Sequence, residues 1–189
     1  MDRIIREEEN IGEVPVPAHL QDIFMQRVEK RKKGDTFSVM GSLRCSCGCE
    51  AFKVHFCGEA KRKHIEVLEF GNTFFVSVVA VCRDCGRKRL IFDSQKHGWE
   101  NVCSEKSQLY EMPSMQTWYC RKCSGEDFFT TVELTAYSKE AFKEDYREEI
   151  AAGDFSESDW KEAFCWIAMD LCCTLCGRKT KNWLDYECS

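Results

Sequence analysis

No stretch of this 189-residue chain is apolar for long enough to cross a membrane. The longest apolar run, "FFVSVVAVC" at residues 74–82, is far shorter than a membrane-spanning helix. The chain also lacks a positively charged start followed by an apolar stretch and a small-residue cleavage site, which is the pattern of an export signal. We therefore expect a cytosolic protein without a membrane partner.

The sequence also lacks a recognisable catalytic signature, because neither a nucleophile elbow nor an oxyanion-site pattern is present. An enzymatic hypothesis rests on "FDSQKHGWE", where Asp93, Ser94 and His97 lie close together in the sequence. A histidine just before a glycine in a turn is more often a loop-ordering residue. We therefore favour a structural role for this loop and a protein that is not an enzyme.

Cysteine, by contrast, is abundant: the chain holds 14 within an ordinary globular composition of 43% hydrophobic residues. This composition excludes disorder throughout. In a secreted chain so many cysteines would indicate disulfides, but without an export signal their short paired spacings favour metal-bound thiolates.

The net charge of −5 is unevenly spread. Residues 43–106 carry 11 basic and 8 acidic side chains, whereas residues 107–189 carry 9 and 16. A zinc ion with four thiolates adds a further charge of −2. The second half is thus a poor candidate for binding phosphate backbones, and any nucleic-acid role would belong to the first half.

Residues 1–42 are interpreted as a lead-in followed by one amphipathic helix. Pro17 suits a first helical position and Gly34 a position just past the end. The run Lys30 to Lys33 would place cations in the last turn, which the helix dipole favours. The apolar stripe consists of Leu20, Ile23, Phe24 and Val28.

From residue 43 the pattern changes to that of strands. Residues 51–57, 64–70 and 73–82 are short runs rich in β-branched and aromatic side chains, and they predict an antiparallel meander. A further strand is predicted after Cys85, in "RKRLIFD".

The second half repeats the first. Placing Cys82 on Cys173 aligns "FFVSVVAVCRDCGRK" with "WIAMDLCCTLCGRK", and "CGCEAF" matches "CSGEDF" upstream. Between these anchors, 34 residues separate Cys47 from Cys82, and 49 separate Cys123 from Cys173. The second copy therefore holds an insertion.

The excess matches a predicted helix over residues 139–152, with Ser138 as its N-cap and Gly153 as its terminator. Phe142, Tyr146 and Ile150 would form its apolar stripe. The resulting organisation is a lead-in over residues 1–42, a first module over 43–106 and a second over 107–189.

Two short cysteine turns brought together by a small sheet supply four thiolates to a tetrahedral zinc ion. The candidate ligands of the second module are Cys120, Cys123, Cys173 and Cys176, and those of the first are Cys45, Cys47, Cys82 and Cys85. Because "RCSCGC" offers three cysteines for two places, Cys49 remains an alternative to Cys45 or Cys47. The repeat register and the following Gly48 favour Cys47.

Other cysteines are predicted not to bind metal. Cys172 falls on Val81 in the repeat alignment, which is an ordinary strand position. Cys57, Cys103, Cys165 and Cys188 have no partner at ligand spacing and are interpreted as packing or incidental thiols.

The segments "CSCGCEAF…VCRDCGRK" and "CRKCSGEDF…CCTLCGRK" resemble zinc ribbons of the rubredoxin-like class, over residues 43–93 and 118–187. The chain also resembles small uncharacterised bacterial zinc-ribbon proteins, a likeness that implies no activity. The class implies a mainly β fold with small helices (α+β), in which two knuckles close each antiparallel sheet. It implies two zinc ions per chain or, alternatively, rubredoxin-like iron and electron transfer.

Zinc-ribbon proteins of this kind often bind macromolecules, so we expect a binding or adaptor module whose partner is a protein. Nucleic acid is the alternative partner. Basic side chains beside the knuckles can also simply offset thiolate charge. The candidate nucleic-acid surface is Lys61, Arg62, Lys63 and His64 with Arg87, Lys88, Arg89 and Lys96.

Overall fold

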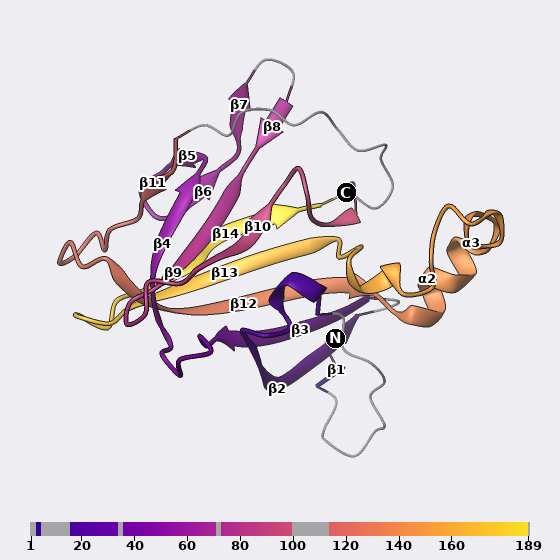
Figure 1. Ribbon diagram of the computed structural model, residues 1–189, viewed down its shortest axis with the longest axis horizontal. Coiled ribbons are helices and arrows are strands. Elements are labelled where there is room, and N and C mark those ends of the chain that lie inside the picture. The colour runs from indigo at the N-terminus through magenta and orange to yellow at the C-terminus, as the bar shows by residue number, and fades with distance from the viewer. Residues whose placement is uncertain (1–2, 5–15, 34–35, 71–72, 100–113, 189) are drawn as a thin grey trace.

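The computed structural model describes residues 3–4, 16–33, 36–70, 73–99 and 114–188, and within them the protein is mainly β (Figure 1). The helices are α2 (Lys139–Asp145) and α3 (Arg147–Ala152), with single 3₁₀ turns at Ala18–Leu20 and Asp159–Lys161. The strands are β1 (Arg3–Ile4), β2 (Phe24–Lys33), β3 (Thr36–Leu43), β4 (Ala51–Cys57), β5 (Glu59–Ala60), β6 (Ile65–Glu66), β7 (Leu68–Phe70), β8 (Thr73–Phe75), β9 (Ser77–Cys82), β10 (Lys88–Asp93), β11 (Gln116–Thr117), β12 (Asp127–Tyr137), β13 (Trp166–Cys173) and β14 (Lys179–Glu187).

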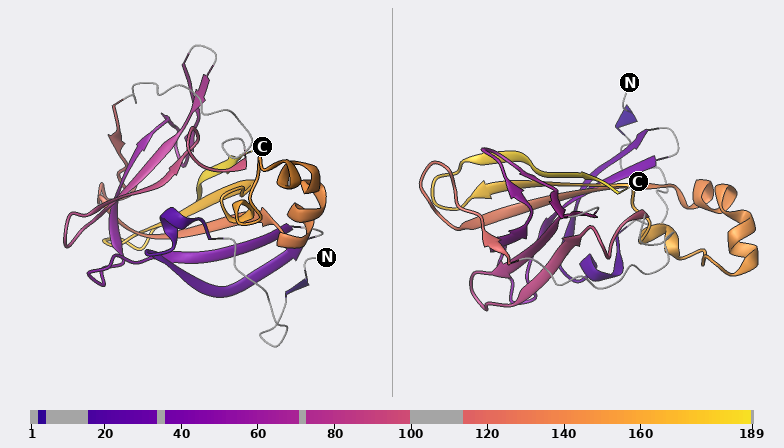
Figure 2. Two further views of the ribbon diagram at one scale, coloured as in Figure 1. Left: turned by 45° about the vertical axis from the view of Figure 1, so that its right-hand side comes forward. Right: turned by 90° about the horizontal axis from the view of Figure 1, so that it is seen from above.

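Ten of these strands form one antiparallel sheet that curls around the core (Figure 2). Its main path runs β1-β2-β3-β12-β4-β9-β10, and β13 joins β12 to β14. The long strand β12 pairs along one edge with β13 and along the other with β3 and then β4. Strands from both predicted modules therefore belong to a single sheet.

The alternation of β12 shows why this segment is a strand. Its even-numbered side chains from Phe128 to Ala136 are buried, whereas Phe129 is 49% exposed. This period of two presents one apolar face to the core. The core is continuous between the halves of the chain, and its largest buried side chains include Phe52, Phe92 and Trp183.

The predicted N-terminal helix is wrong. Only the 3₁₀ turn Ala18–Leu20 is helical there, and β2 pairs with β3 from Phe24 opposite Leu43 to Lys33 opposite Thr36. Leu20, Ile23 and Phe24 are buried in the core, as the apolar pattern predicted, although they do not belong to a helix that continues to Lys33. Pairing with β3, the next strand in the chain, overrode the local helical pattern, and the run Lys30 to Lys33 belongs to β2.

The predicted meander is partly wrong. β4 pairs directly with β9, and β9 with β10, so residues 51–57, 77–82 and 88–93 adopt the expected antiparallel order. The run over residues 64–70 leaves this sheet: β6 pairs with β5, and β7 with β8, in separate two-stranded ribbons. Because β4 and β9 bury one face against the core, they pair best with each other.

The predicted insertion is helical, although it consists of α2 and α3 with a break at Tyr146. The Ser138 hydroxyl accepts a hydrogen bond from the Ala141 N–H at 3.0 Å, and Gly153 ends α3 with φ of 85°. Phe142 is buried in a small cluster with Trp160 and Ala163. The two helices lie beyond one end of the sheet (Figure 1). No helix in the described part of the chain is long and apolar enough to span a membrane.

Candidate metal centres

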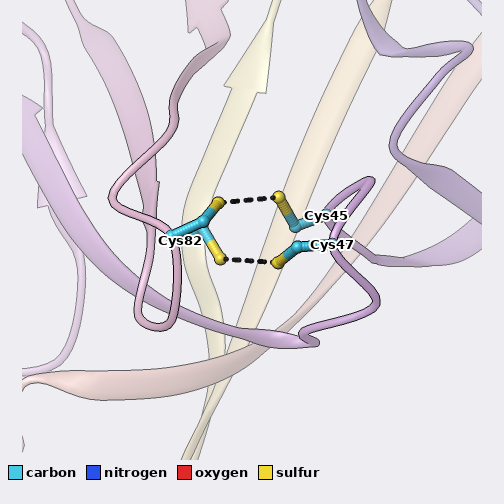
Figure 3. A group of neighbouring side chains, drawn as sticks. Cys45, Cys47 and Cys82 are labelled. Carbon is cyan, nitrogen blue, oxygen red and sulfur yellow. Dashed lines mark hydrogen bonds between the residues drawn. The ribbon is translucent and has the colours of Figure 1, made fainter.

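The first cysteine group gathers at the end of β9. The sulfur atoms of Cys45, Cys47, Cys82 and Cys85 all lie within 4.8 Å of one another. Figure 3 shows the Cys45 and Cys47 sulfurs facing the turn that carries Cys82. The Cys45–Cys85 and Cys47–Cys82 separations are both 3.5 Å, much longer than the roughly 2 Å of a disulfide bond.

The second group has the same arrangement. The sulfur atoms of Cys120, Cys123, Cys173 and Cys176 also lie within 4.8 Å of one another. Cys120 and Cys176 are 3.6 Å apart, as are Cys123 and Cys173. In both groups, each turn contributes one buried cysteine and one that is more exposed.

These separations fit a single metal ion at each group. Four sulfurs placed tetrahedrally at about 2.3 Å from zinc are about 3.8 Å from one another. The separations of 3.5–3.6 Å, with all four sulfurs of each group within 4.8 Å of one another, are close to that value. The two four-cysteine groups could therefore hold two metal ions.

Each group is built from two tight backbone turns with a common hydrogen-bond pattern. The N–H of the residue after the second cysteine donates to the carbonyl of the first, and that residue has a positive φ, between 58° and 91°. This closes the turn and turns both sulfurs to one side. The donors are Gly48 to Cys45, Gly86 to Cys82, Ser124 to Cys120 and Gly177 to Cys173, at 2.8–3.0 Å.

The turn from Cys45 to Cys47 has one residue between its two cysteines, whereas the other three turns have two. It ends before Cys49, the third cysteine of the segment. Cys45 and Cys47 contribute their sulfurs to the group. Cys49 is buried, and its sulfur lies 3.4 Å from both the N–H and the carbonyl of Ala51. Its place is therefore at the start of β4, outside the group.

Cys172 also lies outside its group. The register places it opposite Lys179 and Phe129, and its sulfur is 3.8 Å from the Gly177 carbonyl. Val81, the residue aligned with Cys172 in the sequence, lies opposite Lys88 in the same way. Cys172 thus occupies a strand position beside the site.

Backbone N–H groups lower the pKa of two buried thiols, those of Cys82 and Cys120. Burial opposes the charged form of Cys82, but the N–H groups of Cys85 and Asp84 outweigh it and lower the pKa to about 6. For Cys120, burial is likewise outweighed by the N–H groups of Lys122 and Cys123, and the pKa falls to about 6. Each group therefore provides a thiolate near neutral pH, the form that binds metal.

A row of buried residues links the two groups across the sheet. Cys82 lies opposite Phe52, Phe52 opposite Phe128, and Phe128 opposite Cys173. Both phenylalanines are no more than 2% exposed. The two groups are thus separated by three strand spacings, roughly 14 Å, filled with packed side chains.

The candidate nucleic-acid residues are largely neutralised or dispersed. Lys61 pairs with Glu59 and Glu66, Arg89 with Asp22, and Arg87 donates to the Ser46 hydroxyl. Arg62, Lys63 and Lys88 are exposed. A nucleic-acid role for this surface stays a prediction.

The side chains of Asp93, Ser94 and His97 each accept a hydrogen bond from a backbone N–H group. The Asp93 carboxylate accepts from the Gln95 N–H at 2.9 Å, and the Ser94 hydroxyl accepts from the Val76 N–H at 3.0 Å. His97 Nδ1 accepts from the Asp93 N–H at 3.2 Å, and its ring stacks on His19 at 3.8 Å. These contacts order the loop against the start of β9.

His97 makes stability depend on pH. Burial lowers its pKa from 6.5 to about 3, and His19 and Lys96 act in the same direction. As the pH falls below 6.5, His97 is protonated in the unfolded chain but stays neutral in the folded chain. We therefore expect the free energy of unfolding to fall by roughly 1–2 kcal/mol, because of His97, as the pH is lowered from 6.5 to 5.

Urea unfolding at several pH values checks this expectation. The difference in unfolding free energy between the native chain and His97→Gln should shift against the native chain as the pH is lowered. Acid effects on the cysteine groups are common to both proteins and cancel in that difference. A constant difference over this range contradicts the expectation.

The other cysteines predicted not to bind metal differ in burial. Cys57 and Cys188 are buried, Cys165 is half-buried, and Cys103 lies outside the described residues. Sequence reasoning missed Ser124, which occupies a knuckle position expected for glycine, and Trp118, which packs edge-on against Phe56 and Trp183. No local signal marks Trp118, because its neighbours come from distant strands.

Comparison of the chain with protein-family models, with curated proteins and with solved structures gives no match.

Proposed function

We propose that this chain is a zinc protein with two structural four-cysteine sites, acting as a binding module for a protein partner. The observation that carries the proposal is the pair of tetrahedral-sized sulfur groups, each clamped by two hydrogen-bonded turns. The four sulfurs fill every position of a tetrahedral ion, so no position remains for a substrate. This favours a structural role over a catalytic one.

The corresponding contacts of the two groups support an internal repeat of two zinc-ribbon modules. Arg83 N–H donates to the Ala51 carbonyl at 3.0 Å, and Thr174 N–H donates to the Asp127 carbonyl at the same distance. Phe52 and Phe128, which match in the alignment, lie directly opposite each other. Two ribbons joined back to back through β4 and β12 would give this register.

Exposed apolar side chains beside the second site support a protein partner. Leu175, inside the turn between Cys173 and Cys176, is 73% exposed, and Tyr119, just before Cys120, is 50% exposed. Exposed apolar residues grouped on one surface are typical of protein interfaces. The acidic second half disfavours a phosphate backbone at this place.

Iron in place of zinc is the second candidate, since the same four-thiolate geometry serves rubredoxin-like electron carriers. Native mass spectrometry and visible absorption of the purified protein decide between them. We expect two zinc ions per chain and a colourless solution. Visible absorption with bound iron contradicts the zinc proposal, and one metal ion or none contradicts the pair of sites.

A further inference from the structure

An open cavity of about 590 Å³ lies away from both cysteine groups, where β6 faces β14. Its lining includes the buried apolar side chains of Ile65, Val76 and Leu184. Trp166 and Tyr186 add aromatic surface to its lining. The volume is in the range of natural ligand pockets, and an apolar lining with a few polar groups is their usual composition.

One carboxylate in this cavity is fixed in place by neutral groups. The Trp166 indole N–H donates to Asp185 Oδ1 at 2.6 Å, and the Asn182 side-chain amide donates to Oδ2 at 3.2 Å. Asn182 is itself held, because its backbone N–H donates to Asp170 at 2.8 Å. Within the described part of the chain, no cationic nitrogen lies within 4 Å of the Asp185 carboxylate.

The surroundings favour a cation with an apolar stem. A guanidinium group can bind a carboxylate and stack on an indole ring at the same time, which a lysine ammonium does less well. Trp166 is 38% exposed and supplies that ring. A second lining carboxylate, Glu66, already pairs with Lys61 and His64, which leaves Asp185 as the lining carboxylate without an ion pair in the described part of the chain.

We propose that this cavity binds the arginine side chain of a protein partner, with the guanidinium at Asp185 and the methylene stem against Trp166. The inference rests on the proposed role as a protein-binding module and names the chemistry that the partner presents. The excess of acidic side chains in residues 107–189 favours the approach of such a basic segment.

The test is a titration of the metal-loaded protein with N-acetyl-arginine amide, followed by the ¹H–¹⁵N resonance of the Trp166 indole. Trp166→Phe identifies that resonance by its loss. We expect a saturable shift with the arginine compound and none with N-acetyl-citrulline amide, which has the same shape but no charge. Asp185→Asn should weaken arginine binding about two- to fivefold, the effect of losing one exposed charge pair.

Asp154→Asn is the matched control, since it removes one exposed carboxylate from the helical insertion and should leave the titration unchanged. An equal response to citrulline, or equal weakening by both variants, overturns the inference. So does the absence of any shift in a protein that carries two zinc ions, and this result leaves the metal proposal intact. Loss of the metals is measured separately on the same samples and contradicts only that proposal.

Discussion

Serine in place of Cys173 is expected to remove the metal from the second cysteine group, whereas valine in place of the adjacent Cys172 is not. Cys173 is buried, and its sulfur lies 3.6 Å from that of Cys123 inside the group. A serine hydroxyl is a poor replacement for a thiolate at a zinc site. Because a structural zinc ion contributes on the order of 10 kcal/mol to folding, a large loss of stability of the shared sheet should follow.

The pair of variants isolates metal binding from packing. Native mass spectrometry should count one zinc ion in Cys173→Ser and two in Cys172→Val. Urea unfolding should show a large loss of stability for the first and less than about 1 kcal/mol for the second, because valine fills a similar volume. The assignment fails if Cys172→Val loses the metal or if Cys173→Ser keeps both ions.

Alanine in place of Phe128 is expected to cost about 3–5 kcal/mol of unfolding free energy. Phe128 is 2% exposed and lies between Phe52 and Cys173 in the row that joins the two cysteine groups. Its removal leaves a cavity at the junction of β4 and β12, where only three residue pairs connect the strands. We therefore expect metal retention against a chelator to weaken at both groups.

Phe129→Ala is the matched control, because the neighbouring ring is 49% exposed on the opposite face of β12. Its cost should stay below about 1 kcal/mol, with metal retention unchanged. Urea unfolding and a chelator competition provide the two measurements. Similar costs for both variants, or weakening at only the second group, would show that the row does not couple the sites.

The candidate cysteines could be chosen from sequence because each turn is a local structure. Two cysteines with a short spacing and a following residue at positive φ close a knuckle whatever lies around it, as at Cys82 and Cys85. Aligning the repeats then related Cys47 to Cys123 and separated Cys172 from Cys173. The helix after Ser138 was predictable for the same reason, since its cap is a contact over three residues.

The strand at Phe24–Lys33 could not be predicted in this way. Its residues carry a helical apolar pattern, and strand formation depends on β3 as a partner. The cavity lined by both Val76 and Leu184 depends on residues that are far apart in the sequence. Such features depend on contacts between strands, which the pattern of residues within one segment does not indicate.

The order of residues alone was enough to indicate the cysteine turns, their pairing through the repeat, and the capped helical insertion, because each depends on a few neighbouring residues or on a comparison within the chain. Only the tertiary structure decided that both halves share one sheet through β4 and β12, and that Asp185 is fixed beside Trp166. Strand pairing and cavity formation balance the burial of distant side chains against chain entropy, so their outcome is settled by the whole fold.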